Sequence, residues 1–379
     1  MKTNELEKLG KPYRIFADYV EHAALSQFMD FMRQDCVLQG ALMPDVHAGY
    51  SLPIGAVIAC DGFISPQAVG YDIGCGMCAI LTPFNKDEVK ANSQQIFDAI
   101  YELIPVGSNH NSKTVHWSGL RDLTRTNVVR DLLNSKGSND LHSLGGGNHF
   151  IEIGYDELDR VWIVIHSGSR HMGHSVAKHY MSIAGGDGRA HEGFYGFTEN
   201  SEAGRDYIID LQFCLEYALE NRRGLIGRVF DAIQTHHSKI NKQIDWSALI
   251  NRNHNHAEKK DGLWIHRKGA THAEQGMMGV ISGNMRDGSF IVCGKGNPES
   301  LYSSSHGAGR VMGRAEAKRQ LDMETFIKDM SDRGIQARIE PATLDESAGA
   351  YKNIFEVMAM QPDLVTVIHH ITPMINIKG

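Results

Sequence analysis

The amino-acid sequence predicts an α+β fold, a mixed α/β arrangement of central β-sheets with flanking helices. Short apolar runs that end in turn residues are typical of buried strands. Between them lie longer stretches whose apolar residues recur every three or four positions, as in amphipathic helices. Glycine-rich loops connect the two kinds of segment. Of the 379 residues, 42% are hydrophobic, which is enough to build a large core.

A length prior of roughly 100 to 200 residues per domain would allow two or three domains. The residues with the chemistry of a functional site, described below, are spread from position 72 to position 306. If they converge, the chain folds as one unit around them, so we expect a single domain over residues 1–379 with a metal-lined cleft.

The first third of the chain predicts two helices and two strands. Residues 1–40 have apolar positions near helical spacing and are expected to form a covering helix. The apolar runs 52–60 and 77–81 are expected strands. Asn85 can cap a helix over 85–103, whose apolar residues fall on one face.

The rest of the chain alternates in the same way. Residues 106–144 are rich in Asn, Ser, Thr and charge, so we expect an irregular excursion, either mobile or substrate-facing, with one helix near 119–134. The apolar run 161–165 predicts a strand that delivers His166 at its C-terminal end. The longest helix is expected over 204–240. The remaining expected elements are strands at 263–266 and 289–293, helices near 312–331 and 349–360, and a final apolar run at 364–368.

Composition and charge argue against several classes of protein. No apolar run approaches the ~20 residues of a membrane span and the first residues hold no apolar signal core, so we expect a cytoplasmic protein without membrane association. The six cysteines indicate reduced thiols rather than a disulfide framework. A net charge of −7 argues against a general nucleic-acid coat. Positive charge is still available beside the glycine-rich segments, at Arg170, Arg267, Lys268, Lys295, Arg310 and Arg314.

The segment Gly70-Tyr71-Asp72-Ile73-Gly74-Cys75-Gly76 offers a carboxylate and a thiol three residues apart in a glycine-rich turn. Both side chains bind metal ions once deprotonated. Imidazoles that could complete a site lie in other glycine-rich segments, at His149, His166 and His306. Thiolate and imidazole favour zinc, then iron or copper, whereas the carboxylate leaves room for manganese or for two metals that share a bridging thiolate.

Each of these residues also has a simpler explanation. Asp72 alone could be a turn aspartate and Cys75 a small buried thiol, but their combination with three loop histidines favours a metal site. Cys78 makes a Cys-x-x-Cys pair with Cys75, yet strand alternation places it in the core, which leaves a redox pair as the lesser hypothesis. His254 and His256 point to opposite sides of an extended segment, so at most one of them is expected to be a ligand.

Three glycine loops could turn several backbone N–H groups toward phosphate oxygens. They are Gly145-Gly146-Gly147-Asn148, Cys293-Gly294-Lys295-Gly296-Asn297 and His306-Gly307-Ala308-Gly309-Arg310. None has the spacing of a P-loop or of a Rossmann fingerprint, so neither of those nucleotide sites is expected.

Taken together, the motifs resemble those of the RtcB-type RNA ligases, which join RNA 3′-phosphate or 2′,3′-cyclic phosphate ends to 5′-hydroxyl ends. The matching segments run in family order through nearly the whole chain, and although each is weak alone, the ordered set is specific. They are Met43-Pro44-Asp45-Val46-His47, Asp72-Ile73-Gly74-Cys75-Gly76, 145–152, His166-Ser167-Gly168-Ser169-Arg170, His254-Asn255, His266-Arg267-Lys268-Gly269-Ala270, 306–310, Gly349-Ala350-Tyr351-Lys352 and Lys378-Gly379.

The resemblance implies two manganese ions, bridged by Cys75 and held by Asp72, Cys75, His149, His166 and His254. It implies that His306 attacks GTP to give a histidine-linked GMP, which then activates the RNA 3′-phosphate for displacement by the 5′-hydroxyl. Family correspondence also places Asn148, Glu152, Ser282, Asn284, Gly307, Ala308, Gly309, Tyr351 and Lys378 around the nucleotide, and Arg170 and Arg310 on phosphates.

The sequence departs from the family in two segments. Ser282-Gly283-Asn284-Met285-Arg286 replaces Pro-Gly-Ser-Met-Gly in a nucleotide-contacting loop, and Asp345-Glu346-Ser347-Ala348 replaces Asp-Glu-Ala-Pro. The chain resembles a smaller paralogue that acts in RNA repair or tRNA splicing. Two other functions stay open. A metal-dependent phosphoesterase acting on RNA ends would need neither a histidine nucleophile nor a guanine pocket, and a non-catalytic RNA end-binding protein would tolerate loss of His306.

Overall fold

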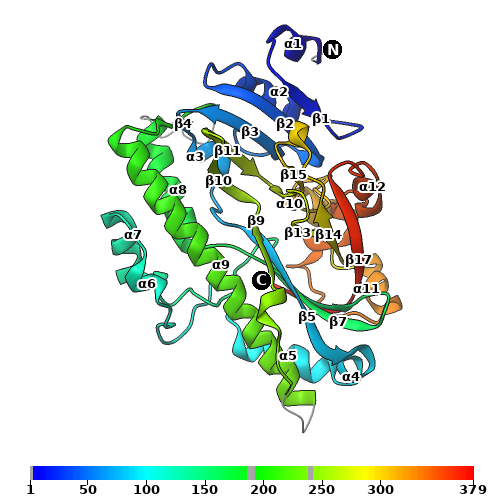
Figure 1. Cartoon of the computed structure of the whole chain (residues 1–379). Helices are drawn as coiled ribbons and strands as arrows, with labels where there is room; N and C mark the ends of the chain where they lie inside the picture. The colour runs from blue at the N-terminus through cyan, green and yellow to red at the C-terminus, as the bar shows by residue number, and fades with distance from the viewer. Residues whose placement is uncertain (1–2, 186–192, 238–241) are drawn as a thin grey trace.

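The computed structural model describes residues 3–185, 193–237 and 242–379 and has two β-sheets at its centre (Figure 1). The five-stranded sheet has the order β1 (Tyr13–Ile15), β2 (Val37–His47), β3 (Ile54–Asp61), β11 (Leu263–Lys268) and β10 (Asn255–Lys260). The eight-stranded sheet has the order β13 (Met278–Ser282), β14 (Ser289–Gly294), β17 (Val365–Lys378), β6 (Phe150–Tyr155), β7 (Arg160–Ser167), β5 (Gly76–Asn85) and β9 (Ile250–Asn253), with β16 (Gln336–Ala337) beside β17. Two small pairs, β12 (Ala270–His272) with β15 (Ser303–Ser305) and β4 (Phe63–Ile64) with β8 (Phe197–Thr198), complete the strands of the described residues.

Helices surround these sheets, as the sequence predicts for a mixed α/β fold (Figure 1). The long helix α9 (Glu202–His237) contacts β7 and β5 and packs against α8 (Arg170–Gly185) and α5 (Ser93–Leu103). None of the helices in the described residues is long and apolar enough to cross a membrane. The other α-helices are α1 (Thr3–Lys8), α2 (His22–Met32), α3 (Pro66–Val69), α4 (Lys86–Ala91), α6 (Gly119–Asp122), α7 (Asn127–Leu132), α10 (Arg314–Gln320), α11 (Met323–Asp332) and α12 (Ile354–Ala359).

Strand alternation divides the eight-stranded sheet between two cores. Cys78 on β5 and Ile163 on β7 pack in the core shared with α5 and α9, as the sequence predicts for Cys78. Their neighbours Met77 and Trp162 pack on the opposite, inner face. That face is enclosed because the end strands β9 and β13 contact each other and curl the sheet. His166 shares the inner alternation of β7, so its side chain belongs to the interior rather than to the helix-covered face.

Most of the predicted elements are present. The expected strands at 52–60, 77–81, 161–165, 263–266 and 289–293 correspond to β3, β5, β7, β11 and β14, and the final apolar run begins β17. The covering helix is α2, which buries Phe28 and Phe31. The longest helix is α9, although residues 238–240 of its predicted range lie outside the described residues.

Four predicted ranges are wrong in detail. The range 1–40 contains α1, β1 and α2 rather than one helix, and its residues 37–40 belong to strand β2 because they pair with β1 and β3. The helix at 85–103 is capped by Asn85 as predicted, but it is interrupted at Asn92, whose side-chain amide donates to Glu88 O. The helix predicted near 312–331 is divided into α10 and α11, because the Asp322 side chain accepts from Thr325 N–H and caps the start of α11.

The fourth range concerns the excursion before the glycine loop. Instead of one helix near 119–134, the structure has α6, α7 and a π-helical turn at Leu133–Gly137. Thr126 separates the two helices, because its hydroxyl accepts from Val128 N–H and caps α7. A smaller difference lies near the C-terminus, where α12 is preceded by a separate 3-10 turn at Ala348–Ala350.

Candidate metal centre and adjoining pocket

One rim of the eight-stranded sheet carries four of the predicted metal ligands. β5 begins where β7 and β9 end, and β6 begins beside the end of β7. Cys75 directly precedes β5, His149 precedes β6, His166 lies near the end of β7, and His254 follows β9. Antiparallel pairing therefore gathers four side chains that are far apart in the sequence.

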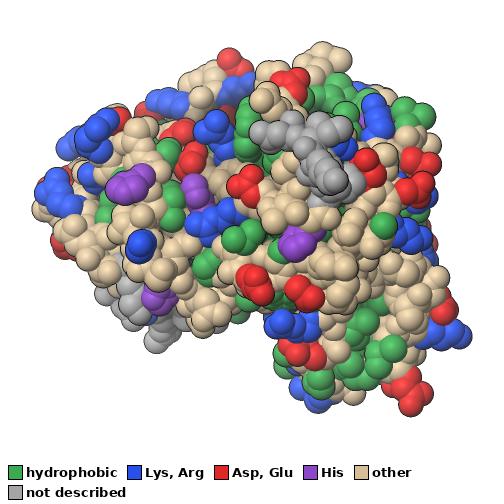
Figure 2. Space-filling model, turned by 90° about the horizontal axis from the view of Figure 1, so that it is seen from below, with side chains coloured by type: hydrophobic (Ala, Val, Ile, Leu, Met, Phe, Trp, Pro, Cys, Tyr) green, Lys and Arg blue, Asp and Glu red, His purple; other side chains and the backbone are tan. Residues whose placement is uncertain are grey.

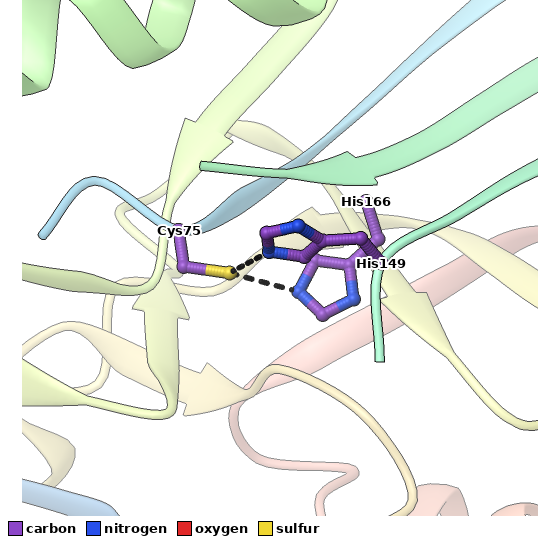
Figure 3. Close-up of side chains that lie close together, drawn as sticks. All are labelled: Cys75, His149 and His166. Atoms are coloured by element: carbon purple, nitrogen blue, oxygen red, sulfur yellow. Dashed lines mark hydrogen bonds between the residues drawn. The ribbon is translucent and has the colours of Figure 1, made fainter. Parts of the chain in front are cut away.

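The ligand atoms lie within a few ångströms of one another. Cys75 Sγ points at two imidazoles, 3.4 Å from His149 Nε2 and 3.1 Å from His166 Nε2 (Figure 3). His254 Nε2 lies 2.9 Å from His166 Nε2, and Asp72 Oδ2 lies 3.0 Å from His149 Nε2. Ligand atoms that share a metal ion at about 2.0 to 2.3 Å lie about 3 Å apart. Cys75, His149 and His166 thus form a group with the spacing of a metal site, and Asp72 and His254 each approach one member of that group.

Glycines allow the carboxylate and the thiol to come this close. Gly70 and Gly74 have φ angles of 94° and 75°, in a region that L-residues rarely adopt. A Cβ atom at Gly168 would collide with the Asp72 carboxylate. The turn closes when Cys75 N–H donates to Asp72 O at 3.1 Å.

Hydrogen bonds behind two of the imidazoles fix which ring nitrogen carries the proton. His166 Nδ1 lies 3.1 Å from Asn148 O, and His254 Nδ1 lies 3.2 Å from Asn255 Oδ1. The Asn255 oxygen also accepts from Gly269 N–H at 2.8 Å, which establishes the orientation of this amide. Both rings therefore donate from Nδ1, and burial keeps their pKa values well below the usual value, so both are neutral.

This tautomer leaves a lone pair on each Nε2, and the two lone pairs face each other at 2.9 Å. Such a contact is repulsive unless a cation lies between the two nitrogens. Burial, and then the charge of Asp72, raises the pKa of the Cys75 thiol well above its usual value, so its thiolate form also needs a cation nearby. Burial would raise the pKa of Asp72 as well, but the contact with His149 and the charge of Arg170 lower it to about 2. The donor set therefore fits a metal ion.

His306 lies beside these ligands at the end of β15, with its ring centre 4.5 Å from that of His254. His306 Nδ1 lies 2.7 Å from Asp45 Oδ2, at an angle outside the range of a hydrogen bond. The backbone N–H groups of His306 and Gly307 donate to the same oxygen. Burial would raise the pKa of Asp45, but the nearby His306 outweighs it and the pKa is lowered.

A pocket adjoins both His306 and the ligand cluster. It is lined by the predicted nucleotide residues Asn148, Glu152, Ser282, Asn284, Gly307, Ala308, Gly309, Tyr351 and Lys378, and by Arg310, His166 and His306. Gly309 has a φ of 75°, and a Cβ there would collide with Asp45 O, so this position requires glycine. Arg170, the other predicted phosphate ligand, lies against His149, with Nη1 3.2 Å from Nδ1.

Comparison with known proteins identifies the family. The family described as "tRNA-splicing ligase RtcB" matches residues 27–130 and 118–379. A protein named "RNA-splicing ligase RtcB" from Escherichia coli (strain K12) is 35% identical over 367 residues, which cover 89% of this chain and 90% of that protein. The chain belongs to the RtcB family.

More distant members of the RtcB family align over similar lengths. A "tRNA-splicing ligase RtcB" from Thermococcus kodakarensis is 27% identical over 468 residues, covering 98% of this chain and 96% of that protein. An "RNA-splicing ligase RtcB homolog 1" from Entamoeba dispar is 27% identical over 424 residues, covering 90% and 79%. The match therefore extends over both sheets and the site between them.

The deep end of the pocket in this RtcB-family chain contains polar atoms without partners. Glu152 Oε1 and Asn376 Oδ1 are buried and have no hydrogen-bond partner among the described residues. The two residues face each other across β6 and β17. Burial raises the pKa of Glu152 to about 8, and Ser289 and Lys378 oppose this rise only in part. Buried polar atoms at a pocket wall indicate that a ligand supplies the missing partners.

Glu346, which the sequence interpretation missed, lies behind the pocket and binds three of the residues that line it, Arg314, Tyr351 and Lys378. It accepts from Lys378 Nζ at 2.5 Å, from Tyr351 OH at 2.7 Å and from Arg314 Nη1 at 2.5 Å. Although burial opposes it, the charges of Lys378 and Arg314 lower the pKa of Glu346 to about 2. The signal was present, because the Asp345-Glu346 pair survives in the altered segment before Gly349. Asp45 lies in the segment 43–47, but nothing in that segment marks its contact with His306.

The altered loop at 282–286 lines the pocket but is held by its own side chains. Asn284 Oδ1 accepts from the backbone N–H groups of Arg286 and Asp287, and Asn284 Nδ2 donates to Asp287 Oδ2. Arg286 also pairs with Asp287 and Asp329. The Asn284 amide is therefore engaged within its own turn, and Ser282 is the other predicted residue of this loop that lines the pocket.

Proposed function

We propose that this chain is a GTP- and manganese-dependent RNA ligase that joins RNA 3′-phosphate or 2′,3′-cyclic phosphate ends to 5′-hydroxyl ends. The observation that carries the proposal is the position of His306, which faces the buried Asp45 on one side and adjoins both the metal-ligand cluster and the pocket. Membership of the RtcB family, whose members are named RNA-splicing ligases, supports it. The proposed role is RNA repair or tRNA splicing in the cytoplasm.

In the first proposed step, His306 Nε2 attacks the α-phosphorus of GTP. A nitrogen–phosphorus bond forms, the bond from that phosphorus to the bridging oxygen breaks, and pyrophosphate leaves. Asp45 has two effects on this step. It favours the proton on Nδ1, so the attacking nitrogen carries the lone pair, and it stabilises the positive charge that the ring acquires.

In the later steps, an oxygen of the RNA 3′-phosphate attacks the phosphorus of the histidine-linked GMP and His306 leaves. The 5′-hydroxyl then attacks the activated 3′-phosphorus, its proton is lost to solvent or a base, and GMP leaves. A 2′,3′-cyclic phosphate must first be opened by water to a 3′-phosphate. Arg170 and Arg310 are proposed to hold the phosphate groups, because guanidinium groups bind phosphate oxygens in pairs.

The proposed metal ligands are Asp72, Cys75, His149, His166 and His254, with Cys75 shared by two manganese ions. When bound, the ions would neutralise charge on the transferring phosphoryl group. The chain's own contribution is to hold the ligands: the Nδ1 hydrogen bonds of His166 and His254 keep their Nε2 lone pairs directed at one place.

Guanine specificity is proposed to come from the two unpartnered acceptors, Glu152 Oε1 and Asn376 Oδ1. Guanine presents two adjacent donors on one edge, N1–H and the 2-amino group, whereas adenine has an acceptor at N1. A site with buried acceptors strongly rejects a base that leaves them unpaired. Lys378 and Tyr351 are proposed to pack on or bond to guanine, and the backbone of Gly307, Ala308 and Gly309, with Asn148 and Ser282, to contact the rest of the nucleotide.

The test is incubation with GTP labelled at the α-phosphate and manganese, followed by a denaturing gel. The wild-type protein should carry an acid-labile, alkali-stable label, and ATP should give none. His306→Ala should give no label, yet it should bind manganese and seal an RNA whose 3′ end already carries the activating guanylate. A wild-type protein that takes no label but removes phosphate from RNA ends would overturn the ligase and establish the phosphoesterase.

A further inference from the structure

Tyr50, Tyr71 and His174 form a row of three aromatic rings in which Tyr71 lies in the middle and the two end residues are exposed. Tyr71 directly precedes the proposed ligand Asp72, and its ring stacks on that of His174 of α8, with ring centres 5.2 Å apart and planes 24° apart. Tyr50 meets Tyr71 edge to face at 6.2 Å. None of the three residues has a role in the steps proposed above.

Tyr50, at one end of this row, is exposed although its loop is firmly held. Tyr50 has 68% of its surface exposed. Gly49 exchanges two hydrogen bonds with the side chain of Gln27, at 2.6 and 3.1 Å, and Lys268 Nζ donates to Tyr50 O. Ser51 has a φ of 59°, a conformation that residues other than glycine seldom adopt. Single exposed apolar residues are common, but a strained and fixed loop that presents one indicates a binding role.

The row also lies next to the chemistry. The loop that carries Tyr50 connects His47 to Ile54, and both of these residues line the pocket beside His306. An RNA end whose phosphate reaches His306 must place its neighbouring nucleotides within a short distance of the pocket rim. Tyr50 is thus three residues from His47 and four from Ile54 of the pocket lining, and Tyr71 directly precedes the proposed ligand Asp72.

The charged side chains of this chain should contribute less to RNA affinity than the aromatic rings do. On the face shown in Figure 2, Lys and Arg side chains of the described residues are interspersed with Asp and Glu rather than gathered in a continuous band. The net charge of the chain is −7. When phosphate contacts contribute less, affinity must come from the bases, and single-stranded RNA ends are held by stacking on aromatic side chains.

We infer that Tyr50, Tyr71 and His174 form a stacking platform for an unpaired nucleobase next to the RNA end that is joined. This inference rests on the proposed function, because it takes the ligand to be RNA. The platform accepts any base, since each base offers a π face, and so it would hold the RNA end without reading its sequence.

The first experiment measures the affinity of a fluorescent single-stranded RNA that ends in a 3′-phosphate or a 5′-hydroxyl. Tyr50→Ala should weaken binding or raise the KM for RNA by about 5- to 150-fold, the range found for loss of one base–aromatic stack. Tyr50→Phe keeps the ring and should bind as the wild type does. Tyr19→Ala is the matched control, because Tyr19 is 76% exposed and lies outside the row.

A second experiment identifies the stacked base. Single abasic sites are placed in turn along the nucleotides near each RNA end, and each RNA is measured with the wild type and with Tyr50→Ala. At one position, loss of the base should weaken binding to the wild type but not to the variant, because the ring and the base act as a pair. If every abasic RNA responds equally in both proteins, or if Tyr19→Ala weakens binding as much as Tyr50→Ala, the platform is wrong.

GMP labelling without RNA keeps this inference separate from the proposed function. A wild type that forms no adduct refutes the ligase itself, whatever the RNA affinities. A wild type that forms the adduct while Tyr50→Ala binds RNA unchanged refutes only the platform.

Discussion

The metal-ligand cluster and the adjoining pocket differ in how their buried polar groups are satisfied. Behind the cluster, the fully buried guanidinium of Arg222 donates four hydrogen bonds to the protein itself. In the pocket, Glu152 Oε1 and Asn376 Oδ1 are buried without any partner in the described part of the chain. Behind the metal ligands, the protein satisfies its own buried donors, whereas the pocket leaves two buried acceptors for a ligand to satisfy.

The acceptors of Arg222 explain why the cluster is already assembled. They include Gly74 O at 2.7 Å, Ser167 O at 2.8 Å and Asn253 Oδ1 at 2.6 Å, which belong to the chain neighbours of three proposed metal ligands. A single side chain on α9 therefore fixes three strand ends relative to one another. Such groups tune metal sites because they fix the positions from which the ligands reach the ion. Changing a buried group at the metal-ligand cluster should therefore weaken metal binding, whereas removing an unpartnered acceptor from the pocket should weaken GTP binding but not the stability of the free protein.

The largest effect is expected at the cluster, from Cys75→Ala compared with Cys78→Ala. Removing the Cys75 thiolate removes the proposed bridging ligand, so manganese affinity should fall by about 100-fold or more and ligation should be abolished. Cys78 packs in the core beneath α9, so its loss should cost about 1 kcal/mol of stability and leave metal binding intact. Isothermal titration with manganese and circular dichroism check both outcomes. Equal losses of activity in two well-folded variants would contradict the assignment.

Arg222→Lys tests whether the framework positions the ligands. Lysine keeps the charge but cannot span acceptors on three strand ends, so manganese should bind about 10- to 100-fold more weakly. Arg223→Lys is the matched control, because the neighbouring guanidinium is mostly exposed and contacts only Glu220 at 3.9 Å among the ion pairs of the described residues. If Arg222→Lys lowers the unfolding midpoint but binds manganese normally, Arg222 stabilises the fold without positioning the ligands.

At the pocket, Glu152→Gln should change the pH dependence of GTP binding. The pKa of Glu152 is about 8 because of burial, so the free protein is mostly protonated there near neutral pH. If guanine donors prefer the carboxylate, GTP affinity should rise roughly tenfold from about pH 6.5 to pH 8 in the wild type and stay flat in Glu152→Gln. Calorimetric titration at several pH values measures this, and parallel curves for the two proteins would contradict the role of Glu152.

Glu152 also makes the stability of the folded protein depend on pH, and its pKa fixes the direction of that dependence. The folded-state pKa of Glu152 lies above its usual value of 4.5, so its contribution to stability is complete below that value and is lost as the pH rises through about 8. The glutamine variant lacks this titration. The wild type should therefore lose stability relative to Glu152→Gln as the pH rises from about 5 to 9, as measured by urea unfolding.

The sequence predicted the parts of this site that depend on local pattern. A five-residue apolar run was enough to place His166 at the end of a strand, because burial and alternation act within a few residues. Strand alternation also predicted that the side chains of His254 and His256 point to opposite sides of their extended segment. The structure sends His254 to the ligand cluster and leaves His256 stacked on His272.

Residues that act through long-range contacts could not be predicted in the same way. Arg222 lies in the middle of a charged helix, where nothing local distinguishes it from the exposed Arg223. The contact between Asp45 and His306 joins positions that meet only when the β12–β15 pair packs against β2 of the five-stranded sheet. Residues 37–40 lack clean alternation, and only pairing with β1 and β3 makes them a strand. Local pattern thus places ligands, whereas the groups that orient them depend on tertiary packing.

The smallest effect is expected from Asn376→Leu. The sign of its change in the free energy of unfolding decides whether the pocket differs from the framework behind the metal ligands. Asn376 Oδ1 is buried and has no partner in the described residues, so an apolar side chain of similar shape should raise the stability of the free protein by about 1 kcal/mol. The same change should weaken GTP binding severalfold, because one acceptor for guanine is lost. Urea unfolding without and with GTP measures both effects in one variant. A variant that is less stable without GTP would mean that the protein already satisfies Asn376. The pocket would then resemble the hydrogen-bonded framework around Arg222 rather than differ from it.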